Sequence, residues 1–190
     1  MASICASVAV AQRRDFREIV TSAGYDWEEY TVTTDDEYIL KAFRITGKTG
    51  EAVSGEWKPP VLLMHGMFGE AESFVKNTVV TPPAFLMVDE GYDVWLGNNR
   101  GNRHSPGHRR LSQQDEAYWD FSVAEFGQYD LPAFINLVKS TTPTDKVILG
   151  GYSQGSTQIM YGLSKYEDSF YADNVSAFLA FAPCSKITNT

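Results

Sequence analysis

The sequence predicts an α/β fold in which helices flank a largely parallel β-sheet. Three short apolar runs, at residues 61–64, 92–96 and 147–149, have the composition of strands that are buried on both faces of a sheet. Longer segments separate these runs, as the crossover connections of a parallel sheet require. The carboxyl ends of such strands meet at one edge of the sheet, and functional sites lie there.

The N-terminal third is expected to hold a short helix and a β-hairpin. Residues 16–27 predict a short amphipathic turn or helix, because Phe16, Ile19 and Val20 share one helical face. Residues 30–33 and 38–44 alternate apolar and polar side chains and are rich in β-forming residues, with a polar turn between them. Residues 47–60 are rich in Gly, Lys, Glu and Pro, which predicts a loop.

The middle of the chain alternates helices and loops. Residues 82–90 predict a helix with proline in its first turn, and residues 97–110 predict a polar, glycine-rich loop. Residues 120–139 are expected to be mainly helical, with Asp120 at the helix start and Asp130 as a cap for the second half.

A serine flanked by glycines follows the apolar run at residues 147–149, with the spacing Gly151-x-Ser153-x-Gly155. A helix to about residue 166 is predicted next, with the apolar positions Ile159, Met160, Leu163 and Tyr166. Strand, sharp turn and helix in this order are what a nucleophile elbow needs, because the turn lifts the serine hydroxyl above the sheet. The glycines let the strand and helix backbones pass close together. The alternative interpretation is a glycine-rich turn in which Ser153 caps the helix.

Composition narrows the classes of function. The 24 acidic and 16 basic residues give a net charge of −8, which disfavours a nucleic-acid-binding protein. No apolar run reaches the ~18 residues of a membrane span. The two cysteines, Cys5 and Cys184, have no metal-ligand spacing, and a disulfide between them is possible. No metal site is predicted.

The first residues do not decide the cellular compartment of the protein. Residues 1–11 are small and apolar, like a short signal-peptide core, yet they carry no basic n-region, so a plain N-terminal segment is the equal alternative. Asn174-Val175-Ser176 is a glycosylation sequon that matters only in a secreted chain. We therefore separate residues 1–15, as a segment of uncertain role, from residues 16–190, as part of one α/β domain.

Several stretches together resemble the acid lipase family of α/β-hydrolases, which includes the gastric and lysosomal acid lipases. The resemblance runs from about Arg17 to about Pro183 and is carried by residues 23–40, 63–67, 91–102, 119–122, 129–133 and 151–156. The block Gly-Tyr-Asp-Val-Trp-Leu-Gly-Asn-Asn-Arg-Gly-Asn at residues 91–102 is the most characteristic. One departure is Tyr152, where the family usually has His.

The resemblance implies a fold and a chemistry. It implies the α/β-hydrolase fold and Ser153 as the nucleophile for ester bonds of neutral lipids, without a metal or organic cofactor. It also implies that the backbone N–H groups of Met67 and Gln154 form an oxyanion hole, which is chemically sensible because two donors then stabilise one oxygen. The family favours a secreted or lysosomal location.

Other polar residues near the predicted strand ends are expected to support the site. His65 and Gly66 belong to the segment that carries Met67, and His65 is expected to order this loop by hydrogen bonding. Asn98 and Asn99 are expected to brace the loop after the second run. His104 and His108 lie in the same polar loop and are expected to pack there rather than act as a base.

The family's catalytic Asp and His follow the serine in the chain, and no position here matches either. The fold is thus expected to be incomplete on its C-terminal side, without the last strands and the cap. The apolar strand at residues 175–182, from Val175 to Ala182, would then be a bare edge, and we expect a companion polypeptide or subunit to cover it.

The sequence is compatible with two functions. The first is a serine lipase or esterase that becomes active when another chain or segment supplies Asp and His. The second is a catalytically inactive, lipase-like structural or lipid-binding subunit of a larger assembly. The intact elbow favours the first function, and Tyr152 favours the second.

Overall fold

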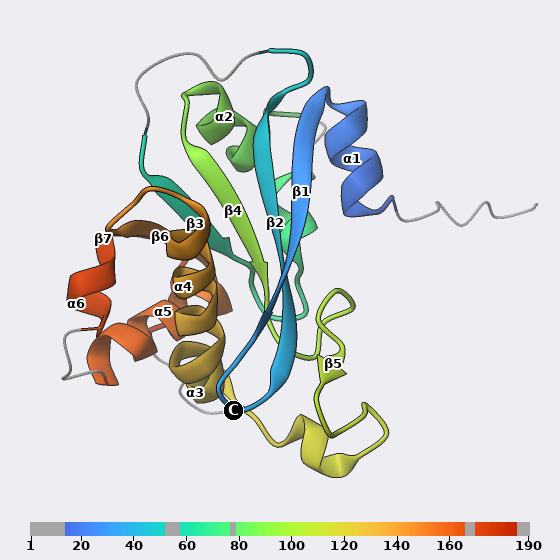
Figure 1. The fold of residues 1–190 in the computed structure, drawn as a ribbon, viewed down its shortest axis with the longest axis vertical. Helices are drawn as coiled ribbons and strands as arrows, with labels where there is room; N and C mark the ends of the chain where they lie inside the picture. The colour runs from blue at the N-terminus through green and yellow to red at the C-terminus, as the bar shows by residue number, and fades with distance from the viewer. Residues whose placement is uncertain (1–13, 52–57, 77–78, 166–169, 186–190) are drawn as a thin grey trace, which may run out of the picture.

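The computed structural model describes residues 14–51, 58–76, 79–165 and 170–185 (Figure 1). The signal-like segment at residues 1–11 and the thiol of Cys5 lie outside these residues. Among the described helices, none has the length and apolar character that crossing a bilayer requires.

One twisted sheet runs through the described part of the chain, in the strand order β1-β2-β4-β3-β6-β7 (Figure 1). Its strands are β1 (Tyr25–Thr33), β2 (Tyr38–Lys48), β3 (Pro60–Met64), β4 (Asp93–Asn98), β5 (Gly107–His108), β6 (Val147–Tyr152) and β7 (Val175–Phe181). Strands β4, β3, β6 and β7 are parallel to one another, whereas β1 and β2 form the antiparallel hairpin and β5 adds a short pairing to β2. The predicted α/β architecture with a mostly parallel sheet is confirmed.

Helices cover both faces of this sheet. They are α1 (Phe16–Ser22), the 3-10 turn η1 (Ala71–Phe74), α2 (Pro83–Asp89), the 3-10 turn η2 (Glu116–Trp119), α3 (Val123–Glu125), the π-helical turn η3 (Phe126–Asp130), α4 (Leu131–Thr141), α5 (Gln154–Lys165) and α6 (Phe170–Asn174). The short helix predicted for residues 16–27 ends at Ser22, because Gly24 takes a positive φ and the chain then turns into β1.

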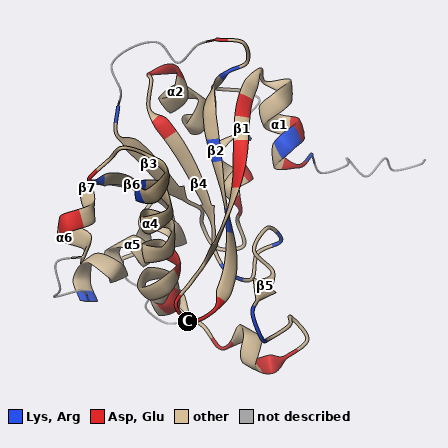
Figure 2. Cartoon of the chain, viewed as in Figure 1, with Lys and Arg blue, Asp and Glu red and all other residues tan. Residues whose placement is uncertain are grey.

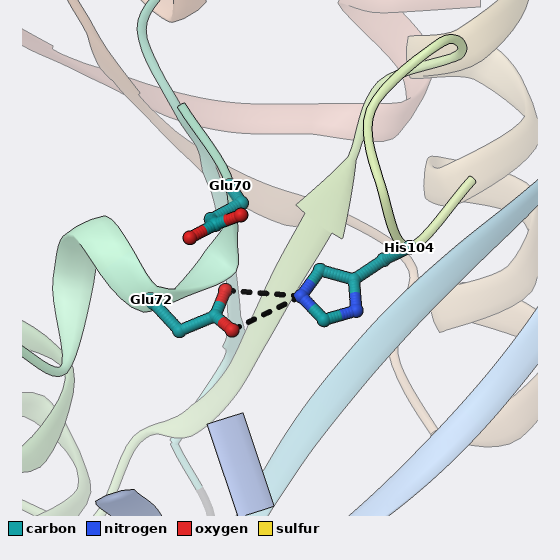
Figure 3. A group of neighbouring side chains, drawn as sticks. All are labelled: Glu70, Glu72 and His104. Atoms are coloured by element: carbon teal, nitrogen blue, oxygen red, sulfur yellow. Dashed lines mark hydrogen bonds and ion pairs between the residues drawn. The ribbon is translucent and has the colours of Figure 1, made fainter. Parts of the chain in front are cut away.

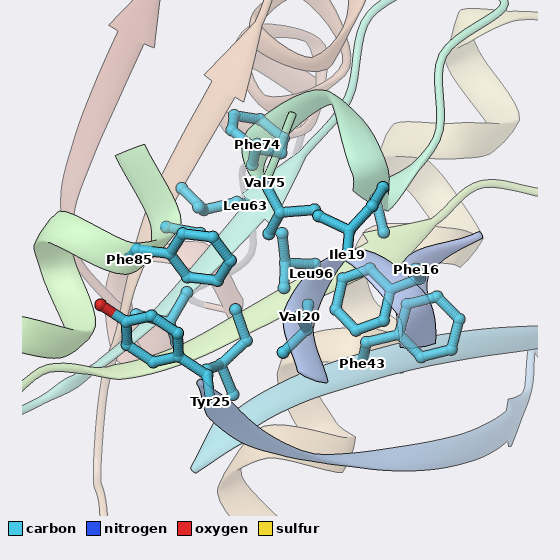
Figure 4. Packing of buried hydrophobic residues seen from close by; sticks show 14 of the residues in the cluster. Phe16, Ile19, Val20, Tyr25, Phe43, Leu63, Phe74, Val75, Phe85 and Leu96 are labelled. Carbon is cyan, nitrogen blue, oxygen red and sulfur yellow. The ribbon is translucent and has the colours of Figure 1, made fainter. Parts of the chain in front are cut away.

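Alternate residues of the central strands pack into two separate cores. Leu63 of β3 and Leu96 of β4 join the core beneath α1, η1 and α2, which Figure 4 shows at close range. Leu62 and Trp95 point the other way, into the core beneath α4 and α5. Residues 61–64 of β3 and 94–96 of β4 are therefore all apolar, as the middle of a strand with two buried faces must be.

The segment predicted as one helix over residues 120–139 is broken into pieces. Asp120 lies outside any helix, and Ser122 caps α3 in a reciprocal capping box with Glu125. Asp130 makes no side-chain capping bond, because its carboxylate binds Arg100 instead. The prediction that Asp120 starts a helix was wrong. Asp130 does occupy the predicted N-cap position of α4, with Pro132 in the first turn, but its side chain makes no capping bond.

The inner face of α5 also differs from the prediction. Its buried residues are mostly small or polar, with Ile159 as the one large apolar side chain among the described positions; they are Gly155, Ser156, Gln158, Ile159 and Gly162. Leu163, one of the apolar positions of the predicted helix, is 41% exposed. The helix needs a small residue at position 162 because it packs closely there: a Cβ on Gly162 would lie 2.5 Å from the hydroxyl of Tyr171.

Strand β7 is the last strand of the sheet within the described residues. It pairs with β6 through residues 175–181, and Leu179 and Phe181 are each more than a third exposed. Figure 2 shows lysine and arginine residues spread over several elements in this view.

Candidate active site

Ser153 lies at the junction between β6 and α5, with no other residue between the two elements. Its φ of 52° is in the left-handed region that non-glycine residues rarely adopt. Its N–H donates to the carbonyl of Phe181 at 2.9 Å, and its own carbonyl accepts from Ser156 at 2.9 Å. The turn is thus strained and held by hydrogen bonds from β7 and α5, which is the geometry of a nucleophile elbow.

The flanking glycines allow the close approach of three elements. A Cβ on Gly155 would lie 2.0 Å from the carbonyl oxygen of Met64 in β3, and one on Gly151 would lie 2.5 Å from the backbone of Gly155. Backbone atoms cannot move away as a flexible side chain could. Any larger residue at either position would therefore displace α5 from the sheet.

The loop after β3 lies directly against the elbow. A Cβ on Gly66 would lie 3.2 Å from the Cβ of Ser153 and 3.1 Å from the ring of Tyr152. The N–H of Gly69 donates to the carbonyl of Gly66 at 3.0 Å, which closes a tight turn around Met67 and Phe68. Met67 is 58% exposed, and Phe68 is 98% exposed with a positive φ of 54°. The N–H of Gln154 begins α5 on the other side of Ser153.

His65 is buried beneath this turn and is bonded at both ring nitrogens. Its Nδ1 faces the carbonyl of Gly66 at 2.9 Å, so this nitrogen carries the proton and donates. Its Nε2 accepts from the N–H of Asn99 at 3.2 Å and lies 3.2 Å from the amide nitrogen of Asn102. Burial lowers the pKa of His65 below its usual value, so the ring is neutral near pH 7.

Asn98 and Asn99 lie at and just after the end of β4 and are almost fully buried. The Oδ1 of Asn98 accepts from the N–H of Ala71 at 3.0 Å and from the amide of Asn102 at 3.1 Å. The amide of Asn99 forms a reciprocal pair with the amide of Gln158 in α5. The sequence patterns did not identify Gln158 as a site residue. The signal that could have found it is a polar residue next to Ile159 on the apolar side of the predicted helix.

A cavity of about 550 Å³ opens beside the elbow, and Gln154 is the elbow residue that lines it. Its apolar walls are Met67, Phe68, Trp119, Phe121, Val123 and Phe126. Its polar side includes His65, Asn99 and Gln154. The arrangement suits a substrate with an apolar chain and one polar group that reaches the N–H of Gln154.

The chain has three histidines, all within the described residues, and each is hydrogen-bonded to a group other than Ser153. His104 binds Glu72, and the Nδ1 of His108 accepts from the N–H groups of Arg110 and Leu111. The side-chain neighbour of the Ser153 hydroxyl is instead the thiol of Cys184 at 3.9 Å. No histidine of this chain therefore stands in hydrogen-bonding position to act as the serine's base.

One cluster beside the cavity has atoms spaced as metal ligands could be. Side-chain oxygens of Glu70 and Glu72 and a ring nitrogen of His104 lie within 4.8 Å of one another (Figure 3). Arg103, however, binds both carboxylates and already balances much of their charge. The cluster is thus explained as a set of ion pairs.

Residues 59–186 match the family model described as "alpha/beta hydrolase fold", and residues 16–78 match "Partial alpha/beta-hydrolase lipase region". This chain belongs to the α/β-hydrolase fold family. Within that family its sequence is lipase-like, and the expected resemblance to acid lipases is confirmed.

Human Lipase member K is 39% identical over 173 residues, covering 91% of this chain and 43% of that protein. Human "Lysosomal acid lipase/cholesteryl ester hydrolase" is 36% identical over 171 residues, covering 90% of this chain and 42% of that protein. The chain thus spans about two fifths of the length of these relatives.

Solved structures support the fold assignment. The Pyrococcus furiosus esterase Pf2001 superposes with a TM-score of 0.59 at 18% identity, over 92% of this chain and 54% of that chain. A putative lipase from Sulfolobus solfataricus also gives a TM-score of 0.59, at 13% identity, over 83% of this chain and 45% of that one. At such low identity these similarities establish the fold and nothing further.

Proposed function

We propose that this chain carries the nucleophile and the oxyanion hole of a serine hydrolase that cleaves carboxylic esters of neutral lipids. The observation that carries the proposal is the strained backbone of Ser153 between β6 and α5, directly beside Gly66. Strain of this kind persists where the surrounding structure enforces it, and it is common at catalytic residues. The printed names of the relatives, which are lipases and a cholesteryl ester hydrolase, supply the substrate class.

In the proposed reaction the Oγ of Ser153 attacks the ester carbonyl carbon. The carbonyl oxygen becomes an oxyanion, which the N–H groups of Met67 and Gln154 stabilise. The Gln154 N–H is the first of α5, where the helix dipole adds to the effect. The tetrahedral intermediate collapses to release the alcohol and leave an acyl-serine, which water then hydrolyses. His65, Gly66, Asn98 and Asn99 keep the two amides in place.

The reaction needs a base to take the proton of Ser153. The three histidines of the chain are bonded elsewhere, so we propose that Asp and His come from another segment or another polypeptide. A polypeptide that covers strand β7 would be suitably placed, since the carbonyl of Phe181 at the end of β7 already bonds Ser153.

The second candidate is a lipase-like module without catalysis that binds lipid or supports an assembly. It is favoured by the engagement of every histidine in other contacts and by the presence of Tyr152 before the serine. The cavity and its aromatic wall would then serve binding alone.

Fluorophosphonate labelling of natively purified protein separates the two candidates. If the protein is a serine hydrolase, we expect a covalent adduct on Ser153, and Ser153→Ala should abolish it. Ser164→Ala is the matched control, because Ser164 lies exposed on the same helix and its removal should leave labelling unchanged. Absence of any adduct, or an adduct that survives in Ser153→Ala, would overturn the catalytic proposal.

A further inference from the structure

We infer that Gln158 is a positioning residue that holds the Met67 amide in alignment with the Gln154 amide. This inference rests on the proposed oxyanion hole and adds a residue that the motif itself does not contain. It rests on hydrogen bonds that lead from Gln158 through Asn99 and His65 to the peptide between Gly66 and Met67.

Gln158 and Asn99 form a closed pair of amide hydrogen bonds. The Nδ2 of Asn99 donates to the Oε1 of Gln158 at 2.8 Å, and the Nε2 of Gln158 donates to the Oδ1 of Asn99 at 3.2 Å. The two residues are 0% and 2% exposed, so water cannot replace either partner. A buried amide that loses its partner carries a full desolvation penalty, so each side chain fixes the other.

Asn99 passes this constraint to His65. Its backbone N–H donates to the Nε2 of His65 at 3.2 Å, and this bond keeps the proton of the neutral ring on Nδ1. The Nδ1–H then donates to the carbonyl of Gly66 at 2.9 Å. The orientation of the ring therefore depends on where the Asn99 backbone lies.

The carbonyl of Gly66 and the N–H of Met67 belong to one peptide unit. This unit is planar and trans, so the two groups point in opposite directions. The carbonyl is held by His65 and by the N–H of Gly69, which directs the Met67 N–H away from both. Since Gly66 also lies against Ser153, a rotation of this peptide would move the Met67 donor relative to the nucleophile.

Helix α5 closes the loop of contacts. It begins with Gln154, which supplies the other proposed donor, and it carries Gln158 on its buried face. The loop that bears Met67 is thus tied, through His65 and Asn99, to the same helix that bears the second amide. The separation of the two donors is fixed by hydrogen bonds rather than by general packing alone.

The test measures phosphonylation of Ser153 in natively purified protein, because the phosphonyl oxygen occupies the oxyanion position. Gln158→Met removes both amide bonds while keeping a similar length. We expect the limiting rate to fall roughly tenfold, with the reagent concentration for half-maximal rate unchanged, since misplacing a donor affects the transition state alone. Gln158→Glu keeps an acceptor for Asn99 and should recover part of the rate.

Ile159→Val is the matched control, because Ile159 is buried beside Gln158 and its truncation weakens α5 without touching the amide pair. It should lower the unfolding midpoint and leave the limiting rate unchanged. A double-mutant cycle sharpens the test: Asn99→Ala keeps the backbone N–H, and Gln158→Met should cost nothing further on that background.

The ring nitrogens of His65 give a readout that does not require activity. Gln158→Met should shift their ¹⁵N resonances, and Ile159→Val should not. If the wild-type protein fails to react, the proposed function fails, and the ring shifts still decide the positioning role. Unchanged ring shifts in Gln158→Met, or equal rate losses in Gln158→Met and Ile159→Val, would overturn the inference.

Discussion

Arg100 and Arg103 lie three positions apart in the loop after β4, and each binds two carboxylates. They differ in burial, because the side chain of Arg100 is 1% exposed and that of Arg103 is 37% exposed. Both contribute to the cavity in front of the elbow. The same kind of ion pair is therefore fully buried at Arg100 and partly open to solvent at Arg103.

Arg100 binds two carboxylates that come from separate segments of the chain. Its Nε and backbone N–H donate to Asp130 at 2.7 and 3.0 Å, and its terminal nitrogens donate to Asp36 at 2.5 and 2.8 Å. Its guanidinium carbon also lies 3.9 Å from the ring centre of Tyr38. Three separate segments are joined by this one side chain, and Asp130 is fully buried.

The carboxylates around Arg103 have further partners. His104 binds Glu72 at 3.1 Å, as Figure 3 shows, and Lys76 lies 3.4 Å from Glu70. Burial by itself would raise the pKa of Glu72, but the hydrogen bond to His104 and the charges nearby lower it below its usual value. The removal of Arg103 would thus leave both carboxylates with other contacts.

The largest effect is expected for Arg100→Met. It leaves Asp130 buried without a counter-ion, and breaking a buried pair in this way costs about 3–5 kcal/mol. Urea denaturation monitored by circular dichroism would measure the loss in free energy of unfolding. Arg110→Met is the control, since that side chain is 76% exposed and its pair with Glu37 should contribute under about 1 kcal/mol.

Arg103→Met should have a smaller effect, of about 1–3 kcal/mol, because His104 and Lys76 still face the carboxylates. The same denaturation experiment measures it. The contrast between the two arginines would be broken if Arg103→Met destabilised the protein as much as Arg100→Met.

The smallest expected effect is a difference in pH dependence. Burial raises the pKa of Asp130 to about 6 despite the charge of Arg100. Folding therefore takes up a proton at Asp130 between its ordinary pKa of 3.8 and about pH 6, and the stability from this group falls as the pH rises through that window. Without Arg100 the pKa should rise further, so the cost of Arg100→Met should shrink by about 1 kcal/mol between pH 7 and pH 5.

The stability contributed by Glu72 depends on pH in the opposite direction from that of Asp130. Its pKa is lowered in the folded state, so the stability it contributes is present above its unfolded value, roughly 4.5, and is lost as the pH falls below it. The cost of Arg103→Met should therefore change less than that of Arg100→Met between pH 7 and pH 5. Denaturation curves of the three proteins at both pH values provide the measurement, and parallel pH profiles for the two variants would contradict the distinction.

Local patterns in the sequence were enough to predict the turn that holds Ser153. The strand before Ser153 and the glycines on either side specify a sharp corner by local sterics, so this geometry could be predicted from a few adjacent residues. Whether the Asp130 side chain makes a capping bond could not be predicted in this way. A carboxylate before a helix has the same local sequence whether it caps the helix or binds a distant arginine. Only the buried position of Arg100 separates the two cases.

The sequence by itself determined the α/β class, the two-sided burial of β3 and β4 and the position of the elbow, since each follows from the spacing of neighbouring residues. Tertiary structure decided which polar groups pair: Gln158 with Asn99, and Asp130 with Arg100. These partners come from distant segments that the sheet brings together, and burial makes each unpaired polar group costly. Hydrogen-bond partners of this kind therefore cannot be read from local sequence patterns.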